Sequence, residues 1–173
     1  MDWLVVLLRL LHIGGGIFWV GGAFTFFLFV APSLERLAPP DRKTFLDGLI
    51  GQRRFASIIL AAATITILAG AALYWRASGG LHPAFVSSGV GLGFTIGGLA
   101  GLGAWLIAAL VIGPTFTRLS GLSDEILVAG RAPTAAEGAR LAGLGARLRL
   151  ASRALLTFLA IAALFMAISR YIR

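Results

Sequence analysis

The stretch LLHIGGGIFWVGGAFTFFLFVAP, residues 10–32, decides the fold of this chain, because it contains no Asp, Glu, Lys or Arg. An α-helix rises about 1.5 Å per residue, so a helix of this length crosses the roughly 30 Å hydrocarbon core of a bilayer. The apolar character begins earlier, near Trp3, and returns in residues 55–75, 85–113 and 154–168. We therefore predict an all-α, polytopic membrane protein with four transmembrane helices.

The composition of the whole chain agrees with this prediction. Hydrophobic residues make up 58% of the chain and charged residues 13%, whereas a soluble domain has about 45–50% and about 25%. The absence of cysteine excludes disulfides, thiolate metal sites and cysteine nucleophiles. The net charge of +8 would suggest a nucleic-acid partner in a soluble protein. Because the basic residues flank the apolar stretches, we assign them to the anionic lipids of the bilayer and predict no nucleic-acid partner.

Basic residues are distributed unevenly between the two sides of the predicted membrane. The connections between the first and second helices and between the third and fourth carry eleven of them: Arg36, Arg42, Lys43, Arg53, Arg54, Arg118, Arg131, Arg140, Arg147, Arg149 and Arg153. The opposite side carries four: Arg9, Arg76, Arg170 and Arg173. Cytoplasmic loops carry an excess of Lys and Arg. We therefore predict a bacterial-type inner (plasma) membrane protein with both termini outside.

The chain divides into two helical hairpins, residues 1–76 and 83–173, which we expect to form a single membrane domain. A weak repeat relates the hairpins, because VAPSLERL at residues 30–37 resembles IGPTFTRL at residues 112–119. In addition, RFAS leads into the second span and RLAS into the fourth. The repeat suggests two hairpins in the same sense, related by an axis along the membrane normal. The alternative is a chance similarity between two basic membrane exits.

The two inner connections are expected to contain helix as well as coil. Asp41, which follows two prolines, is a predicted N-cap, and Thr134 with Glu137 has the spacing of a capping box. We interpret these segments as inner extensions of the second and fourth helices. Residues 120–132 are predicted to form a loop.

Glycines spaced by four residues occur in the third span, at Gly93, Gly97 and Gly101. Lipid tails are as apolar as leucine, so membrane helices associate through the close backbone approach that glycine permits. The glycine-rich face of the first helix is the expected partner of these residues, and a contact between subunits is the alternative.

Arg9 and His12 are the polar residues of the first helix that need an explanation, since they lie one turn apart in apolar surroundings. A neutral imidazole inside a bilayer still needs hydrogen-bond partners, and a charged one is costly. Gly15, Gly16 and Trp19 follow on the same face. This stripe predicts a slot for a flat ligand beside His12, while a hydrogen bond between helices is the simpler role for a lone membrane histidine.

The predicted topology places both histidines and both methionines in the outer half, with His82 in the loop before the third helix and Met166 near the end of the fourth. Three arginines lie at a similar level: Arg9, Arg76 and Arg170. A haem b needs imidazole ligands for its iron and cations for its propionates, and these residues provide both. A copper site would instead use His12, His82 and Met166.

Leu11-His12, Trp19, Gly21-Gly22 and the exit Val30-Ala31-Pro32 resemble the first helix of the copper-resistance D-like family and of related uncharacterised four-helix membrane proteins. The step of seven from His12 to Trp19 is also similar to that of the HemJ-type protoporphyrinogen oxidases. These four-helix proteins bind haem b through a first-helix histidine, which implies His12 as the ligand here. They also depend on a lysine in a later helix. The single lysine of this chain, Lys43, lies outside the spans, so the resemblance does not extend to oxidase activity.

We therefore expect a small membrane protein that binds haem b, or copper, near the outer face through His12, for electron transfer or for handling metal or haem. His82 is the expected second ligand and Arg9 the charge partner, and no catalytic residue is predicted. One alternative is a cofactor-free accessory subunit of a larger respiratory or photosynthetic complex, packed against other membrane subunits or against its own copies. Another is copper uptake or transfer.

Overall fold

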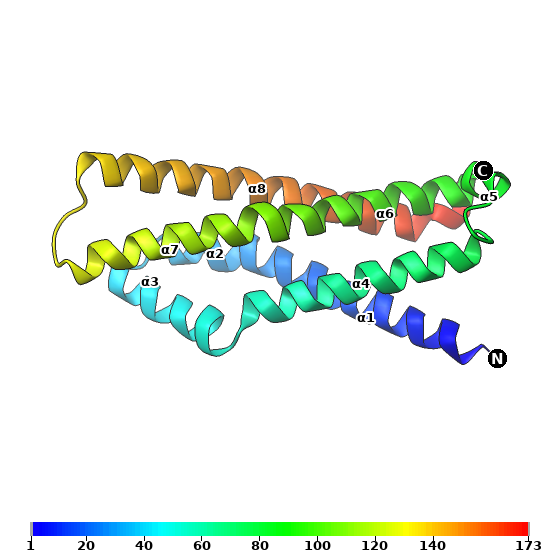
Figure 1. The fold of residues 1–173 in the computed structure, drawn as a ribbon, viewed down its shortest axis with the longest axis horizontal. Coiled ribbons are helices and arrows are strands. Elements are labelled where there is room, and N and C mark those ends of the chain that lie inside the picture. The colour runs from blue at the N-terminus through cyan, green and yellow to red at the C-terminus, as the bar shows by residue number, and fades with distance from the viewer. Residues whose placement is uncertain (1, 173) are drawn as a thin grey trace.

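The computed structural model describes residues 2–172 and confirms the all-α fold, with four long helical rods running along the longest axis (Figure 1). The α-helices are α1 (Trp3–Thr25), α2 (Ala31–Leu34), α3 (Pro39–Leu46), α4 (Phe55–Ala77), α5 (Pro83–Val86), α6 (Gly89–Ile107), α7 (Gly113–Val128) and α8 (Ala135–Ile168). Three π-helical segments, η1 (Phe26–Val30), η2 (Asp47–Gln52) and η3 (Ala108–Ile112), and one 3₁₀ turn, η4 (Ser169–Tyr171), complete the order. Arg173, one of the predicted outer basic residues, lies outside the described residues.

Four continuous helical runs are long and apolar enough to cross a membrane: Trp3–Leu34, Phe55–Ala77, Gly89–Val128 and Ala135–Tyr171. They form a four-helix membrane bundle in which α1 packs mainly against α4, and α6 packs mainly against α8. The short helix α5 and both ends of the chain lie at one end of the bundle, while α3 and the connection from α7 to α8 lie at the other (Figure 1). The four predicted spans are therefore confirmed.

Both hairpins carry the same interruption where their first helix leaves the apolar region. A five-residue π-helical segment, η1 in one hairpin and η3 in the other, ends two residues before a proline, Pro32 or Pro114. Proline has no backbone N–H, and its ring clashes with the carbonyl one turn earlier, so the helix rearranges at this point. The repeated sequence motif thus has the same local structure in both hairpins.

The second part of the sequence repeat does not have a common structure. RFAS begins α4 directly after Arg54, which has the left-handed conformation with φ 52°. RLAS instead lies inside the uninterrupted helix α8. The two hairpins are therefore alike at the exit of their first helix and different at the entry of their second.

Gly15 of α1 and Gly97 of α6 allow the two helices of each hairpin to approach closely. A Cβ atom on Gly15 would lie 3.3 Å from the carbonyl oxygen of Ala62, and one on Gly97 would lie 3.3 Å from the carbonyl oxygen of Ala162. Each hairpin thus brings a glycine of its first helix against an alanine carbonyl of its second.

The predicted partner of the third-span glycines is wrong. Gly93 faces Ser169, and Gly97 faces Met166, so both pack against the last helical run of the chain rather than against α1. The physical reason is connectivity, because helices that follow one another through a short connection pack as neighbours. Only a short segment separates α7 from α8, and it folds α8 back along α6.

The two hairpins meet in a small buried cluster of apolar residues: Trp19, Ala23, Ala63, Ala104, Leu155 and Leu159. Two side-chain hydrogen bonds also join α4 to α6. The hydroxyl oxygens of Tyr74 and Thr95 lie 2.6 Å apart, and the indole N–H of Trp105 donates to the hydroxyl of Thr64 at 3.0 Å. These bonds satisfy polar groups that would otherwise face hydrocarbon.

The two connections that the sequence places on the inner side are helical, as predicted, with two differences in detail. Helix α3 begins at Pro39, so Asp41 lies in its first turn rather than at the N-cap; proline suits a helix start because it lacks the N–H that would be unpaired there. Arg54 separates η2 from α4, so α3 is not continuous with the second span. Thr134 and Glu137 form the predicted capping box.

The prediction of a loop over residues 120–132 is wrong, because α7 continues to Val128. Leu119, Leu122 and Ile126 recur at steps of three and four residues, which places them on one face of a helix. Ile126 is buried, so this face packs against the protein and keeps the segment helical.

An ion-pair cluster fixes α3 to α7 on the same side. The ammonium of Lys43 lies 2.9 Å from the Asp124 carboxylate and 3.0 Å from the Asp47 carboxylate. The hydrogen bond to Asp124, followed by that to Asp47, raises the pKa of Lys43 above its ordinary value. These ion pairs therefore join the connection that contains α3 to the end of α7.

Replacing Gly97 tests the packing of α6 on α8. We expect Gly97→Leu to destabilise the protein by about 1–3 kcal/mol, the cost of overpacking a close contact. The matched control is Gly98→Leu, since no atom lies within 4 Å of the position of a Cβ on Gly98. Thermal unfolding in detergent measures both variants, and equal losses would contradict the packing described here.

Candidate functional site

The imidazole of His12 connects α1 to α4 in the middle of the first hairpin. Its Nδ1 atom lies 2.8 Å from the backbone carbonyl oxygen of Thr66, and Thr66 is the central residue of α4. At about 1.5 Å per residue, this carbonyl is about 16–17 Å from either end of the helix. His12 is therefore held deep in the apolar region.

Gly70 makes room for the imidazole ring. A Cβ atom on Gly70 would lie 2.6 Å from Cε1 of His12 and 2.7 Å from its Nδ1, which is closer than any real Cβ atom comes. Gly70 is the single glycine of α4. The ring consequently lies directly against the backbone of α4, between Thr66 and Gly70.

The hydrogen bond fixes which nitrogen of His12 carries a proton. A carbonyl oxygen only accepts, so Nδ1 must be the donor to Thr66. In the neutral ring the proton is then on Nδ1, and Nε2 keeps its lone pair. An imidazole whose Nδ1–H is bonded to a backbone carbonyl has the arrangement that orients histidine ligands of metal ions. The chemistry of His12 therefore suits a ligand that binds through Nε2.

The predicted slot along the same stripe is largely filled by protein. A Cβ atom on Gly15 would meet the Thr66 hydroxyl oxygen at 2.6 Å, and the Thr66 hydroxyl itself donates to the carbonyl of Ala62 at 2.8 Å. Trp19 is buried in the apolar cluster between the hairpins. Gly16 has only an ordinary contact, at 3.6 Å, with the Thr66 methyl group. On this face of α1, Gly15 therefore packs against α4, and Trp19 packs into the apolar cluster between the hairpins.

The three predicted arginines have different surroundings. Arg9 is exposed one turn before His12 in α1, and no carboxylate lies within 4 Å of it among residues 2–172. Arg76 instead forms an ion pair of 2.5 Å with Asp2, which joins the start of α1 to the end of α4. Arg170 lies exposed in η4. Arg9 is the one placed nearest to His12 along the chain.

The other predicted metal ligands lie on different elements. His82 is exposed in the connection after α4, beyond the end of that helix. Met166 packs against Gly97 inside the second hairpin, whereas His12 packs inside the first. Among residues 2–172, no group of three or more His, Asp or Glu side chains is placed to hold a metal ion. Of the three predicted metal ligands, His12 is therefore held apart from His82 and Met166, with the carbonyl of Thr66 as its hydrogen-bond partner.

Sequence reasoning missed Thr66 and Gly70, the two residues that position His12. Both lie on α4 one turn apart, which is the spacing of residues on one helix face. Gly70 was a detectable signal, because a single glycine in an otherwise Ala-, Ile- and Leu-rich span marks a place of close approach. The pairing of that glycine with His12 depends on the crossing of two helices, which sequence alone does not provide.

Comparisons of the chain with protein-family models, with curated proteins and with solved structures find no match.

A double-mutant cycle tests the contact between His12 and Gly70. We expect Gly70→Ala to destabilise the protein by about 1–3 kcal/mol, because the new methyl group overlaps the ring. In a His12→Ala background the same substitution should cost less than about 0.5 kcal/mol, since the overlapping ring is gone. Reversible unfolding of the four proteins measures the coupling. Additive effects would show that the ring does not lie on Gly70.

Proposed function

We propose that this protein binds haem b in the membrane, with His12 as an axial ligand of the iron. The observation that carries the proposal is the hydrogen bond of 2.8 Å between Nδ1 of His12 and the carbonyl of Thr66. It leaves the lone pair of Nε2 available for a metal ion, on an oriented and half-buried ring. The resemblance of the first helix to haem-binding four-helix proteins supports the same assignment.

The donor set favours haem over a copper ion. Haem would bring its own porphyrin nitrogens to the iron, so a single protein imidazole, that of His12, would be enough to hold it. A copper ion held by protein side chains alone needs several ligands together. His82, the other histidine, is exposed in the connection beyond the end of α4, whereas His12 contacts the middle of that helix. Arg9, one turn outward, is the cation that we assign to a haem propionate.

The residues of this chain have separate roles in the proposed site. The backbone carbonyl of Thr66 accepts a hydrogen bond from the Nδ1–H of His12, which fixes the ring and increases the basicity of Nε2. Gly70 lets the ring reach that carbonyl. Bound haem would supply one-electron chemistry, and the surrounding apolar helices would hold it away from water.

The second candidate is a cofactor-free accessory subunit. Its supporting observation is a set of glycines with no atom within 4 Å of their Cβ positions, among them Gly14 and Gly21 of α1 and Gly98 of α6. Glycines on the surface of a membrane helix allow another helix to pack closely against it. In this case His12 would serve only to join α1 to α4.

The visible absorption spectrum of the detergent-purified protein separates the two candidates. We expect a Soret band that shifts on reduction with dithionite and is lost in His12→Ala. His82→Ala is the control and should keep the band, because His82 lies outside the bundle. A spectrum without a Soret band after growth with added haem precursor, or an unchanged band in His12→Ala, would overturn the proposal.

We also propose that the protein lies in the inner membrane with both termini outside, on the basis of its arginine distribution. The absence of cysteine permits a direct test with single substitutions. A membrane-impermeant maleimide added to spheroplasts should label Ala77→Cys, at the outer end of α4, and leave Ala132→Cys unlabelled until lysis. The reverse pattern would invert the topology.

A further inference from the structure

Two of the four helical runs are much longer than a bilayer is thick. Arg54 and Arg76 lie at the two ends of α4 and are about 33 Å apart at 1.5 Å per residue, close to the roughly 30 Å of a hydrocarbon core. The run Gly89–Val128 has 40 residues and the run Ala135–Tyr171 has 37, so each is about 55–60 Å long. These two runs therefore continue well beyond the bilayer.

The excess length lies at the end of the bundle that carries α3. At the other end Gly93 faces Ser169, which directly precedes Arg170, the first charged residue after the apolar stretch of α8. Counted from Gly93 and Ser169, a core of about 30 Å ends near Gly113 on the run through α6 and α7, and near Arg149 on α8. The tips of α7 and α8 then lie about 20 Å further, in the aqueous phase.

The charged residues at the α3 end form two layers. The layer nearer the membrane, which we call the arginine belt, lies within about 8 Å of this apolar edge by the same count and consists of Arg53, Arg54, Arg118, Arg147, Arg149 and Arg153. All six are exposed, and among residues 2–172 no carboxylate lies within 4 Å of any of them. The belt therefore has cations that the described part of the protein does not neutralise.

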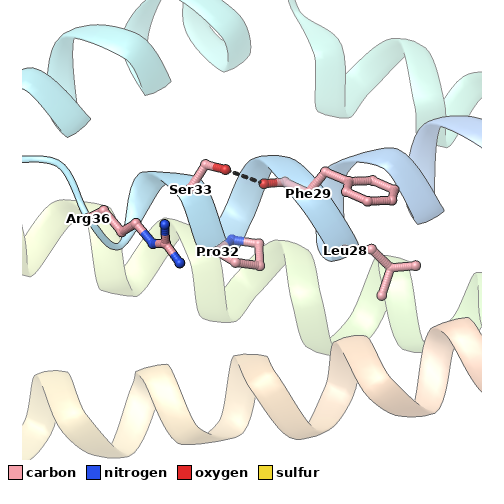
Figure 2. A pocket seen from close by; sticks show the side chains of 5 residues that line it. All are labelled: Leu28, Phe29, Pro32, Ser33 and Arg36. Atoms are coloured by element: carbon pink, nitrogen blue, oxygen red, sulfur yellow. Dashed lines mark hydrogen bonds between the residues drawn. The ribbon is translucent and has the colours of Figure 1, made fainter.

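The second layer lies about 13–21 Å beyond the apolar edge and is nearly neutral. It contains five basic residues and six acidic ones: Arg36, Arg42, Lys43, Arg131, Arg140, Glu35, Asp41, Asp47, Asp124, Glu125 and Glu137. The ion pairs of Lys43 and of Arg131 belong to it. Arg36 also belongs to this layer, and Figure 2 shows it beyond Pro32 and Ser33, at the end of the helical run that begins with α1. The second layer thus balances its own charge.

We propose that the arginine belt binds the phosphates of anionic phospholipids in the leaflet at the α3 end of the bundle, with Arg149 and Arg153 as its main site. A bilayer with its headgroups is about 40–45 Å thick, so the headgroups extend about 5–8 Å past the hydrocarbon on each side, which is the depth of the belt. Lipid headgroups are therefore what surrounds these side chains in a membrane. Phosphate oxygens accept charge-assisted hydrogen bonds from guanidinium groups, and the unneutralised cations favour anionic over zwitterionic lipids.

Arg149 and Arg153 are the best placed residues of the belt for one headgroup. They are four residues apart and so lie on one face of α8. A Cβ atom on Gly145 would lie 3.4 Å from Nη1 of Arg149, which shows that this guanidinium extends one turn away from the hydrocarbon. Arg153 starts about one turn inside the edge and reaches the same layer by the length of its side chain. Leu150 is 71% exposed beside them and provides an apolar surface for an acyl chain.

Native mass spectrometry of the detergent-solubilised full chain tests the proposal, with phosphatidylglycerol and phosphatidylcholine added in equal amounts. We expect the parent protein to retain phosphatidylglycerol preferentially. The double variant Arg149→Gln/Arg153→Gln should retain it about 20-fold more weakly, about five-fold for each lost arginine. The matched control is Arg36→Gln/Arg140→Gln, which removes the same charge from the second layer and should retain the lipid like the parent protein. All four side chains are exposed, and gel filtration checks that both variants stay folded.

Three results would overturn the proposal. The first is equal retention of phosphatidylglycerol by the two double variants, which would assign any effect to net charge rather than to the arginine belt. The second is equal retention of the two lipids by the parent protein. The third is full displacement of phosphatidylglycerol by inorganic phosphate at equal concentration, which would identify a site for free phosphate. None of these depends on haem, so the outcome is independent of the function proposed for His12.

Discussion

The hydrogen bond from His12 to the carbonyl of Thr66 is the constraint on which the first hairpin depends. An imidazole in hydrocarbon must find a partner, and the nearest acceptors on a neighbouring helix are its backbone carbonyls. These are reached only where the two backbones approach closely. Gly70 provides that approach on one side of the ring, and Gly15 provides it for Thr66 on the other. The two glycines allow α1 and α4 to pack closely, and this close packing allows His12 to reach its hydrogen-bond acceptor. The packing of the hairpin and the hydrogen bond of the imidazole therefore depend on each other.

The same physical rule shapes the second hairpin with different residues. Gly97 approaches the carbonyl of Ala162, as Gly15 approaches that of Ala62, but Met166 fills the space beside it. The second hairpin thus uses a flexible apolar side chain and contains no buried imidazole there. The two hairpins share a packing scheme and a proline exit, and among residues 2–172 only the first places an imidazole between its two helices. This difference is why we assign the ligand site to the first hairpin.

The four spans and their hairpin order could be predicted from the sequence because they follow from hydropathy. The cost of burying a polar group singles out His12 in the same way, and its role as a ligand stays a prediction. The sequence was insufficient wherever the answer depended on which helices meet. The sequence predicts α1 as the partner of Gly93 and Gly97, which instead pack against the last helical run. It also predicts a loop over residues 120–132, where α7 continues to Val128 with Ile126 buried. Gly70 and Thr66 carry no chemistry of their own, and they matter only because α4 crosses α1 at His12.

The protonation state of His12 tests the central claim most directly. Nitrogen-15 NMR of the haem-free protein, in a His82→Gln variant that leaves a single histidine, reports which ring nitrogen carries the proton. At a pH where the ring is neutral, the account predicts a proton held on Nδ1 and a bare Nε2. A proton on Nε2, or rapid exchange between the two nitrogens, would contradict both the hydrogen bond to Thr66 and the assignment of His12 as a ligand.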